Sequence, residues 1–215
     1  MVKQHIAAAL LIGLLSATSS QAASVSFFLD QSNRLPDNVN YLQVTIADGA
    51  AGAIDFTVSA LQPLLDIAGN NFGIKKFAFN VIGGTATESG DVSALPDHWR
   101  ARDGGRMDGF GLFDIKLVTN KNRNSQDPLT FSITGVSLDT ILSYVDLSSG
   151  RSPQGFSLFS AQVVGLDSDW CAPGVAGACV TQAFFGGTQA VPAPPAIWLL
   201  GTAVAALAGR RMRRA

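Results

Sequence analysis

Histidine is almost missing from this 215-residue chain, which contains only His5 and His98. The chain has no G-x-S-x-G sequence, the motif that would identify a nucleophilic serine. A Ser-His-Asp triad would also have to use His98 as its base. A zinc site built on several imidazoles is disfavoured by the same scarcity. The composition therefore argues against both of these hydrolytic chemistries.

Glutamate is also nearly absent, because fifteen of the sixteen acidic residues are aspartate and only Glu88 is glutamate. Aspartate favours turns and disfavours helix interiors, whereas glutamate does the reverse. The chain contains 22 glycines and 13 phenylalanines as well. This composition favours strands joined by tight turns over helices.

The first 22 residues have the pattern of a secretory signal peptide. Lys3 supplies a positive charge, and the uncharged apolar segment Ile6–Leu15 follows it. Small residues at Ser20 and Ala22 then provide a signal peptidase site, which predicts cleavage after Ala22. The alternative, an N-terminal membrane anchor, is disfavoured because ten apolar residues span only about half of a hydrocarbon core.

The C-terminal residues 191–215 have a three-part order: a proline cluster, an apolar stretch and a cluster of arginines. The stretch predicts a membrane helix over 196–209, whose length of about 20 Å is short for a core of about 30 Å. Uncharged flanking residues and arginines that extend towards the interface compensate for the deficit. Four terminal cations then keep this end cytoplasmic and place the body of the chain outside: Arg210, Arg211, Arg213 and Arg214.

This tail resembles the PEP-CTERM sorting signal of Gram-negative, exopolysaccharide-producing bacteria. The resemblance rests on the motif Val191-Pro192-Ala193-Pro194-Pro195, followed by the apolar stretch and the arginines. Ala193 stands where the family usually has glutamate. The resemblance implies recognition by an exosortase in the inner membrane, removal of the tail, and release or attachment of the body outside.

Between the two ends, residues 23–190 have the length of a single domain. All sixteen acidic residues but only ten of the fifteen basic ones lie in this body, so its net charge is −6. Such an excess of acid argues against a nucleic-acid partner.

The only two cysteines are Cys171 and Cys179, both in the body. Because export leads to an oxidising compartment, we expect them to form a disulfide that closes a small Gly- and Pro-containing loop. A metal site or a redox pair is disfavoured, since no histidine or further cysteine is close in sequence.

Short segments of alternating hydrophobicity predict an all-β fold, an antiparallel β-sandwich for which a jelly-roll-like arrangement is one alternative. The firmest element is a hairpin formed by the two runs on either side of residues 48–52. A short helix is expected over Ser137–Val145, with Ser137 as its N-cap. The predicted strands are Ser26–Leu29, Tyr41–Ala47, Ala53–Ala60, Ile74–Ile82, Phe110–Thr119, Leu129–Thr134, Phe156–Gly165 and Thr181–Phe185.

The body also resembles the β-sandwich regions that often precede this kind of tail, through segments such as YLQVTIADGAAGAIDFTV, NNFGIKKFAFNV, MDGFGLFD and DPLTFSITG. These are patterns of strands and turns. The resemblance therefore implies a shared fold and carries no activity with it.

Candidate catalytic and metal-binding residues are sparse. We expect His98 to be exposed in the polar loop Pro96–Arg100, which precedes the polar segment Arg102–Arg106. The aspartates of residues 97–114 and the pair Asp167 and Asp169 could in principle form a glycosidase dyad, and Asp103 with Asp108 could bind calcium. Clustering of aspartate is, however, expected in a chain rich in turns. We therefore assign no catalytic residue, no metal and no cofactor.

Trp99 and Trp170 lie in polar segments. Exposed indoles on a β-sandwich can stack on sugar rings, whereas buried ones fill the ends of the core. Both alternatives stay open for each residue. The sequence thus predicts a non-enzymatic exported protein of the cell surface or extracellular matrix, with a carbohydrate-binding module for exopolysaccharide as the alternative.

Overall fold

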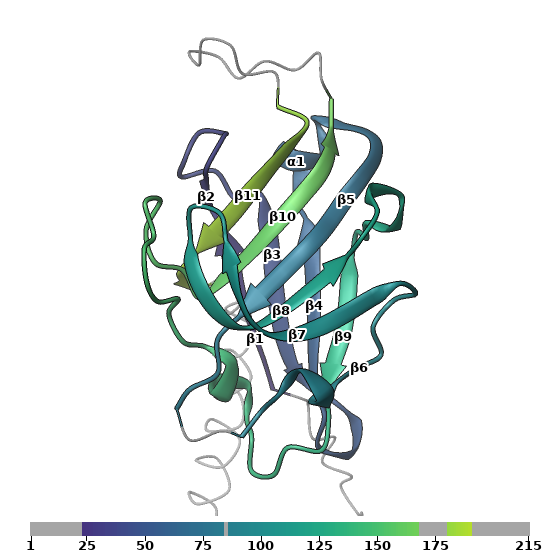
Figure 1. Cartoon of the computed structure of the whole chain (residues 1–215), viewed down its shortest axis with the longest axis vertical. Coiled ribbons are helices and arrows are strands. Elements are labelled where there is room, and N and C mark those ends of the chain that lie inside the picture. Colours follow the sequence, from purple (N-terminus) through teal and green to yellow (C-terminus); the bar gives the residue numbers. More distant parts are fainter. Residues whose placement is uncertain (1–22, 84–85, 168–179, 191–215) are drawn as a thin grey trace, which may run out of the picture.

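The computed structural model describes residues 23–83, 86–167 and 180–190, which fold into two packed, mostly antiparallel β-sheets (Figure 1). Sheet A has the strand order β12-β1-β3-β4-β9-β6, and sheet B has the order β2-β11-β10-β5-β8-β7. The strands of sheet A are β1 (Ser24–Leu29), β3 (Leu42–Asp48), β4 (Ile54–Ala60), β6 (Val92–Ser93), β9 (Leu129–Ile133) and β12 (Gln189–Ala190). Those of sheet B are β2 (Gln31–Ser32), β5 (Ala68–Phe79), β7 (Trp99–Met107), β8 (Gly111–Thr119), β10 (Phe159–Leu166) and β11 (Gln182–Gly187).

The β-sandwich and its predicted hairpin are confirmed. Strands β3 and β4 pair in register from Leu42 opposite Ala60 to Asp48 opposite Ile54, and a 3₁₀ helix at Ala50–Gly52 connects them. Every second residue of β3 is buried, because successive side chains of a strand point to opposite faces. The alternation of apolar and polar residues that predicted these strands therefore corresponds to side chains that point alternately into the core and away from it.

A cluster of aromatic rings joins the two sheets. Phe56 of sheet A lies 4.7 Å from Phe131, its neighbour on β9, and 5.2 Å from Phe79 on sheet B, measured between ring centroids. Phe77 of sheet B stacks on Phe159 at 6.1 Å. All five rings are at most 2% exposed. Aromatic pairs at these distances contribute about 0.5–1.5 kcal/mol beyond the burial of their surface.

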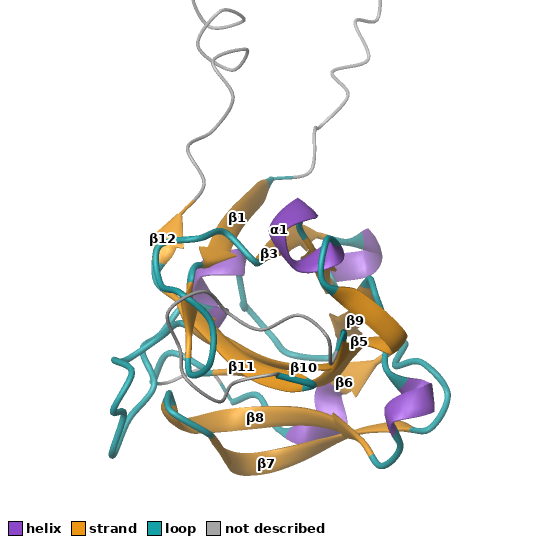
Figure 2. Cartoon of the chain, turned by 90° about the horizontal axis from the view of Figure 1, so that it is seen from above, coloured by secondary structure: helices purple, strands orange, loops and turns teal. Residues whose placement is uncertain are grey.

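Sheet B bends strongly, so that β7 and β8 lie on the opposite side of β10 and β11 from sheet A (Figure 2). A second buried cluster forms there from Ala78, Met107, Phe110 and Phe113, with Phe184 packed against it. Gly186 makes this contact possible, since a Cβ atom on it would come within 2.4 Å of the Phe110 ring. The hairpin of β7 and β8 is thus held onto the outer face of β11 by an aromatic residue that requires a glycine beneath it.

Two sequence-based predictions were wrong. The polar loop predicted over Pro96–Arg100 extends only to His98, because Trp99 and Arg100 begin β7, an edge strand of sheet B that was not predicted and that pairs along its length with β8. In place of a helix over Ser137–Val145, the structure has only a 3₁₀ helix at Ile141–Tyr144, capped by the side chains of Thr140 and Ser143. The one described α-helix is the single turn α1 (Gln62–Leu65). In the described residues no helix has the length and apolar character needed to cross a bilayer.

The predictions for residues 1–22, for the sorting motif and membrane helix within 191–215, and for Trp170, Cys171 and Cys179 fall outside the described residues. They stay predictions.

Truncation of the central ring tests the role of the aromatic cluster. We expect Phe56→Ala to lower the free energy of unfolding by about 3–5 kcal/mol, because it leaves a cavity between the sheets that neighbouring rings cannot fill. Urea denaturation measures the change. Leu138→Ala, at a residue that is 98% exposed, is the control and should stay within about 0.5 kcal/mol of the wild type. A loss below about 1 kcal/mol for Phe56→Ala would contradict the central role of this ring.

Candidate functional site

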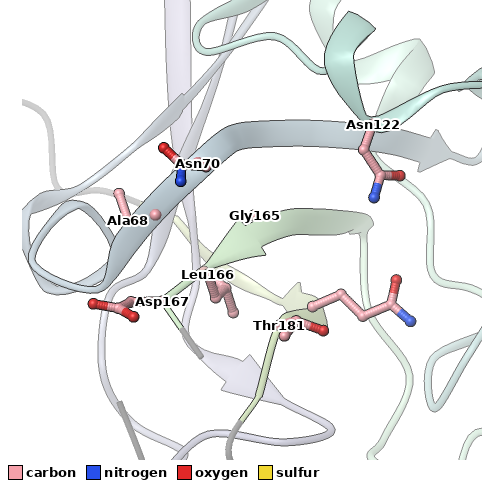
Figure 3. Close-up of a pocket in the computed structure, with 9 residues that line it drawn as sticks. Ala68, Asn70, Asn122, Gly165, Leu166, Asp167 and Thr181 are labelled. Atoms are coloured by element: carbon pink, nitrogen blue, oxygen red, sulfur yellow. The ribbon is translucent and has the colours of Figure 1, made fainter. Parts of the chain in front are cut away.

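A polar hollow of about 650 Å³ opens where β5 begins and β10 ends (Figure 3). Its volume lies within the range of small-molecule binding sites, about 300–1,000 Å³. The lining comes from three strand ends and one 3₁₀ helix, Asn122–Asn124. The residues that line it are Ala68, Gly69, Asn70, Asn122, Gly165, Leu166, Asp167, Thr181 and Gln182.

Irregular pairing between β5 and β10 shapes the floor of the hollow. The register shifts twice, between Gln162 and Val163 and between Val164 and Leu166. Gly165 has φ +70°, and a Cβ atom there would lie 2.5 Å from the backbone of Asn71. Because bulges bend a strand and re-aim its side chains, this pairing opens the end of the sheet without separating its strands.

Amide side chains dominate the polar lining. The Gln182 Oε1 atom accepts a hydrogen bond of 3.0 Å from Gln162 Nε2. The Asn122 Oδ1 atom accepts one of 2.7 Å from the Lys75 ammonium group. In the described part of the chain, the NH₂ groups of Gln182 and Asn122 have no hydrogen-bond partner of their own. Hydrogen bonds to the side-chain oxygen atoms thus orient both amides, and their NH₂ groups are available to donate to a ligand.

The chemistry of this hollow suits a neutral, hydroxyl-rich ligand. Amide donors at Asn70, Asn122 and Gln182, together with the Thr181 hydroxyl, match the hydroxyl and ether oxygens of a sugar. Asp167 is the one carboxylate in the lining. A pair of carboxylates, as glycoside hydrolysis requires, is therefore not present among the described lining residues.

The hollow lies at the opposite end of the sandwich from the two ends of the described body. Ala23 accepts a hydrogen bond from the backbone of Asp48, next to the connection between β3 and β4. Strand β12 pairs antiparallel with β1, so it runs towards that same end. Helix α1, the start of β5 and the end of β10 lie at the other end (Figure 1), and residues of these strand ends line the hollow. The two ends of the described body, Ala23 and Ala190, are therefore separated from the hollow by the length of the sandwich.

Trp99 is buried, with only 8% of its surface exposed. Its indole nitrogen donates a hydrogen bond of 2.9 Å to the carbonyl of Asn124. A ring covered in this way fills one end of the core and offers no free face to a sugar. Of the two alternatives for this residue, the structure therefore favours burial.

Three of the aspartates that were considered for catalysis or calcium, Asp103, Asp108 and Asp114, accept hydrogen bonds from neighbouring segments. Asp103 accepts hydrogen bonds from the backbone and hydroxyl of Ser89, at 2.6 and 2.8 Å. Asp114 accepts from the backbone of Val81, and Asp108 from the Asn33 amide. His98 is exposed in a turn, as predicted. Within residues 23–83, 86–167 and 180–190, no three His, Cys, Asp or Glu side chains gather as a metal site would require.

Of the candidate residues that the sequence singled out, Asp167 lines the hollow, and the amide side chains of the lining were not predicted. Asn70, Asn122 and Gln182 come from three distant segments and share no motif. The one local signal is the Gly69-Asn70-Asn71-Phe72-Gly73 run at the start of β5, since glycines within a strand pattern mark bulges.

No model of a known protein family matches this chain, and no curated protein or solved structure shows significant similarity to it.

The Asp103 contacts make the stability of the fold pH-dependent. The Ser89 hydrogen bonds hold the pKa of the Asp103 carboxyl below its ordinary value of 3.8. A depressed folded-state pKa stabilises the fold above the unfolded-state value, and this contribution disappears as the pH falls through the folded-state pKa. We therefore expect Asp103→Asn to lose less stability than the wild type between about pH 6 and about pH 2.

Urea denaturation across this pH range measures the difference. Ser89→Ala removes one of the two donors and should give an intermediate pH dependence. Identical pH profiles for the wild type and Asp103→Asn would show that these hydrogen bonds contribute nothing to stability.

Proposed function

We propose that this chain is a non-enzymatic exported protein, a component of the cell surface or extracellular matrix that is held or sorted through its C-terminal tail. One observation supports this above all: both ends of the described body leave the sandwich at one end, while the polar hollow opens at the other. A body tethered through residues 191–215 would carry its hollow away from the membrane.

A role without catalysis agrees with how the polar side chains are used. The carboxylates of Asp103 and Asp114 bind backbone amides of neighbouring segments, and Trp99 fills the core. The hollow offers hydrogen-bond donors without an arrangement of nucleophile and base. Binding or presentation is therefore the function that this surface suits best.

Export would begin at a signal peptide over 1–22 that signal peptidase removes. The tail would then stop in the inner membrane with its arginines in the cytoplasm, and an exosortase would process it near Pro192-Ala193-Pro194. A disulfide between Cys171 and Cys179 and a jelly-roll-like arrangement of the sandwich belong to the same proposal.

Intact-mass spectrometry of the protein recovered from producing cells tests the proposal. We expect an N-terminus at Ala23, loss of the tail after the proline cluster, and a mass lower by two hydrogen atoms than that of the reduced protein. Replacing all four terminal arginines with glutamine should reduce retention and processing, since no cluster of cations would then stop transfer. A full-length chain found soluble in the cytoplasm would end the proposal.

A second candidate function, carbohydrate binding, is favoured by the amide lining of the hollow. Neutral sugars are recognised through hydroxyl groups, and the NH₂ groups of Asn122 and Gln182 are positioned to donate to them. Binding a soluble exopolysaccharide strand at this end would keep the polymer clear of the membrane that carries the tail.

Alanine substitution in the hollow tests this candidate. We expect Asn70→Ala and Gln182→Ala each to weaken binding of a neutral polysaccharide such as dextran by about five-fold, because each change removes one or two hydrogen bonds to the ligand. Affinity electrophoresis in gels containing the polysaccharide measures the change. Asn40→Ala, at an exposed amide outside the hollow, is the matched control and should bind as the wild type does. Equal binding by all four proteins would remove the hollow as a sugar site.

A further inference from the structure

Four of the ten basic residues in the body share the outer face of sheet B. Residues directly opposite each other in an antiparallel pair point to the same side of the sheet. Arg102 lies opposite Lys116, and Lys116 lies opposite Ala78. Arg100 and Lys76 lie on either side of Val118. Their neighbours Phe77, Ile115 and Leu117 belong to the core, so these four cations, the basic face, point away from sheet A.

The basic face spans three neighbouring strands, β5, β8 and β7. With strands about 4.8 Å apart, the cations cover about 10 Å across the sheet. Arg102 and Lys116 are like charges placed directly opposite each other, an arrangement that is unfavourable for the sheet itself. The gathering of positive charge in a body of net charge −6 is therefore not explained by the folding of the sheet.

The cations of this face are not held in ion pairs among the described residues. In the described residues, none of its four cations makes an ion pair, and Arg100 donates only to the Asn120 side chain. Burial lowers the pKa of the Lys76 ammonium, and the charges of Lys116 and Lys75 lower it further, against an opposing effect of Asp108. The exposed Asp114 carboxylate on β8 is used by the Val81 amide.

Sugar-compatible groups connect the basic face to the hollow. Gln162 lies opposite Lys76 on one side and Phe184 on the other, and it hydrogen-bonds Gln182 of the hollow. Lys76 lies over the half-buried Phe184 ring, 5.4 Å from its centroid. Gln162 is only 5% exposed, and its Oε1 atom has no hydrogen-bond partner in the described residues. An amide, an aromatic ring and cations thus follow one another along one face of the sheet.

We propose that this face binds an acidic polysaccharide, a polymer of uronic acids, whose carboxylates contact Lys76, Arg102 and Lys116 and whose adjoining sugars extend towards the hollow. The inference rests on the carbohydrate-binding candidate above and adds the charge of the ligand. Two components of such a polymer have a counterpart: cations for its carboxylates and amides for its hydroxyl groups.

A polyuronate fits this surface better than a nucleic acid does. The four cations occupy one face, while the body as a whole repels a polyanion of high charge density. Double-stranded DNA carries one charge per about 1.7 Å of its axis, whereas a polyuronate carries only one carboxylate per sugar and requires fewer compensating charges over the same length.

Affinity electrophoresis of the full chain, purified in a mild detergent, tests the proposal with alginate as the acidic probe and dextran as the neutral one. We expect tighter binding to alginate, and a weakening by about three- to ten-fold for Lys116→Gln and for Arg102→Gln. Lys116→Arg keeps the charge and should retain alginate binding. Arg34→Gln is the matched control, because Arg34 is exposed on the loop between β2 and β3, away from these strands. Raising sodium chloride from about 0.05 M to about 0.5 M should abolish the preference for alginate, since screening weakens exposed charge pairs.

The outcomes separate this proposal from the one on which it rests. Equal affinity for alginate and dextran, with no loss in Lys116→Gln or Arg102→Gln, overturns the acidic ligand and leaves carbohydrate binding intact. Binding to neither polymer removes the carbohydrate candidate together with this inference, whereas export is measured independently by mass spectrometry. Equally tight binding of single-stranded DNA, lost in the same variants, overturns the assignment to a polysaccharide. Circular dichroism and urea midpoints equal to those of the wild type confirm that the variants are folded.

Discussion

Packing of aromatic rings between the two sheets is the constraint on which the other features depend. Phe56 and Phe131 come from sheet A and Phe77 and Phe79 from sheet B, with centroids 4.7–6.1 Å apart where they touch. Large rigid rings fix the separation of the sheets and the register of the strands that carry them, because a slip of one residue would turn every ring towards solvent. Because these rings fix the packing at the centre of the sandwich, the strand ends can deviate from regular pairing without disrupting the core.

Sheet B deviates from regular pairing or packing at both of its ends. Near the hollow, two register shifts and Gly165 bend β10 away from ideal pairing with β5. At the opposite end, Phe110 packs on Gly186 and holds the hairpin of β7 and β8 against the outer face of β11. Glycine is required in both places for a steric reason, since a Cβ atom would collide with backbone in one case and with a ring in the other. The hollow and the position of the hairpin are therefore consequences of where the sheet departs from regularity.

Strands that bury one face could be predicted from the sequence, whereas the edge strand β7 and the hollow could not. In β3 and β4 the alternation of apolar residues records burial directly. Strand β7, with the sequence WRARDGGRM, lies at the edge of its sheet with most of its side chains exposed, so it lacks that alternation and resembles a polar loop. The hollow joins residues more than a hundred positions apart through bulges that have no sequence signature beyond a few glycines. Only contact in three dimensions identifies such a site.

Positive and negative charges are distributed unevenly over the described body. Acidic residues occur in strands and connections of both sheets, whereas the cations Lys76, Arg102 and Lys116 gather on one side of sheet B. A charge distribution of this kind attracts an anion to one face and repels it elsewhere, so an approaching polymer is oriented before it makes contact. The ends of the body lie opposite the hollow, so a tether attached there would not obstruct a ligand at the hollow. The placement of the termini thus favours attachment of the sandwich at one end. The arrangement of charge favours a ligand at the basic face and at the opposite end.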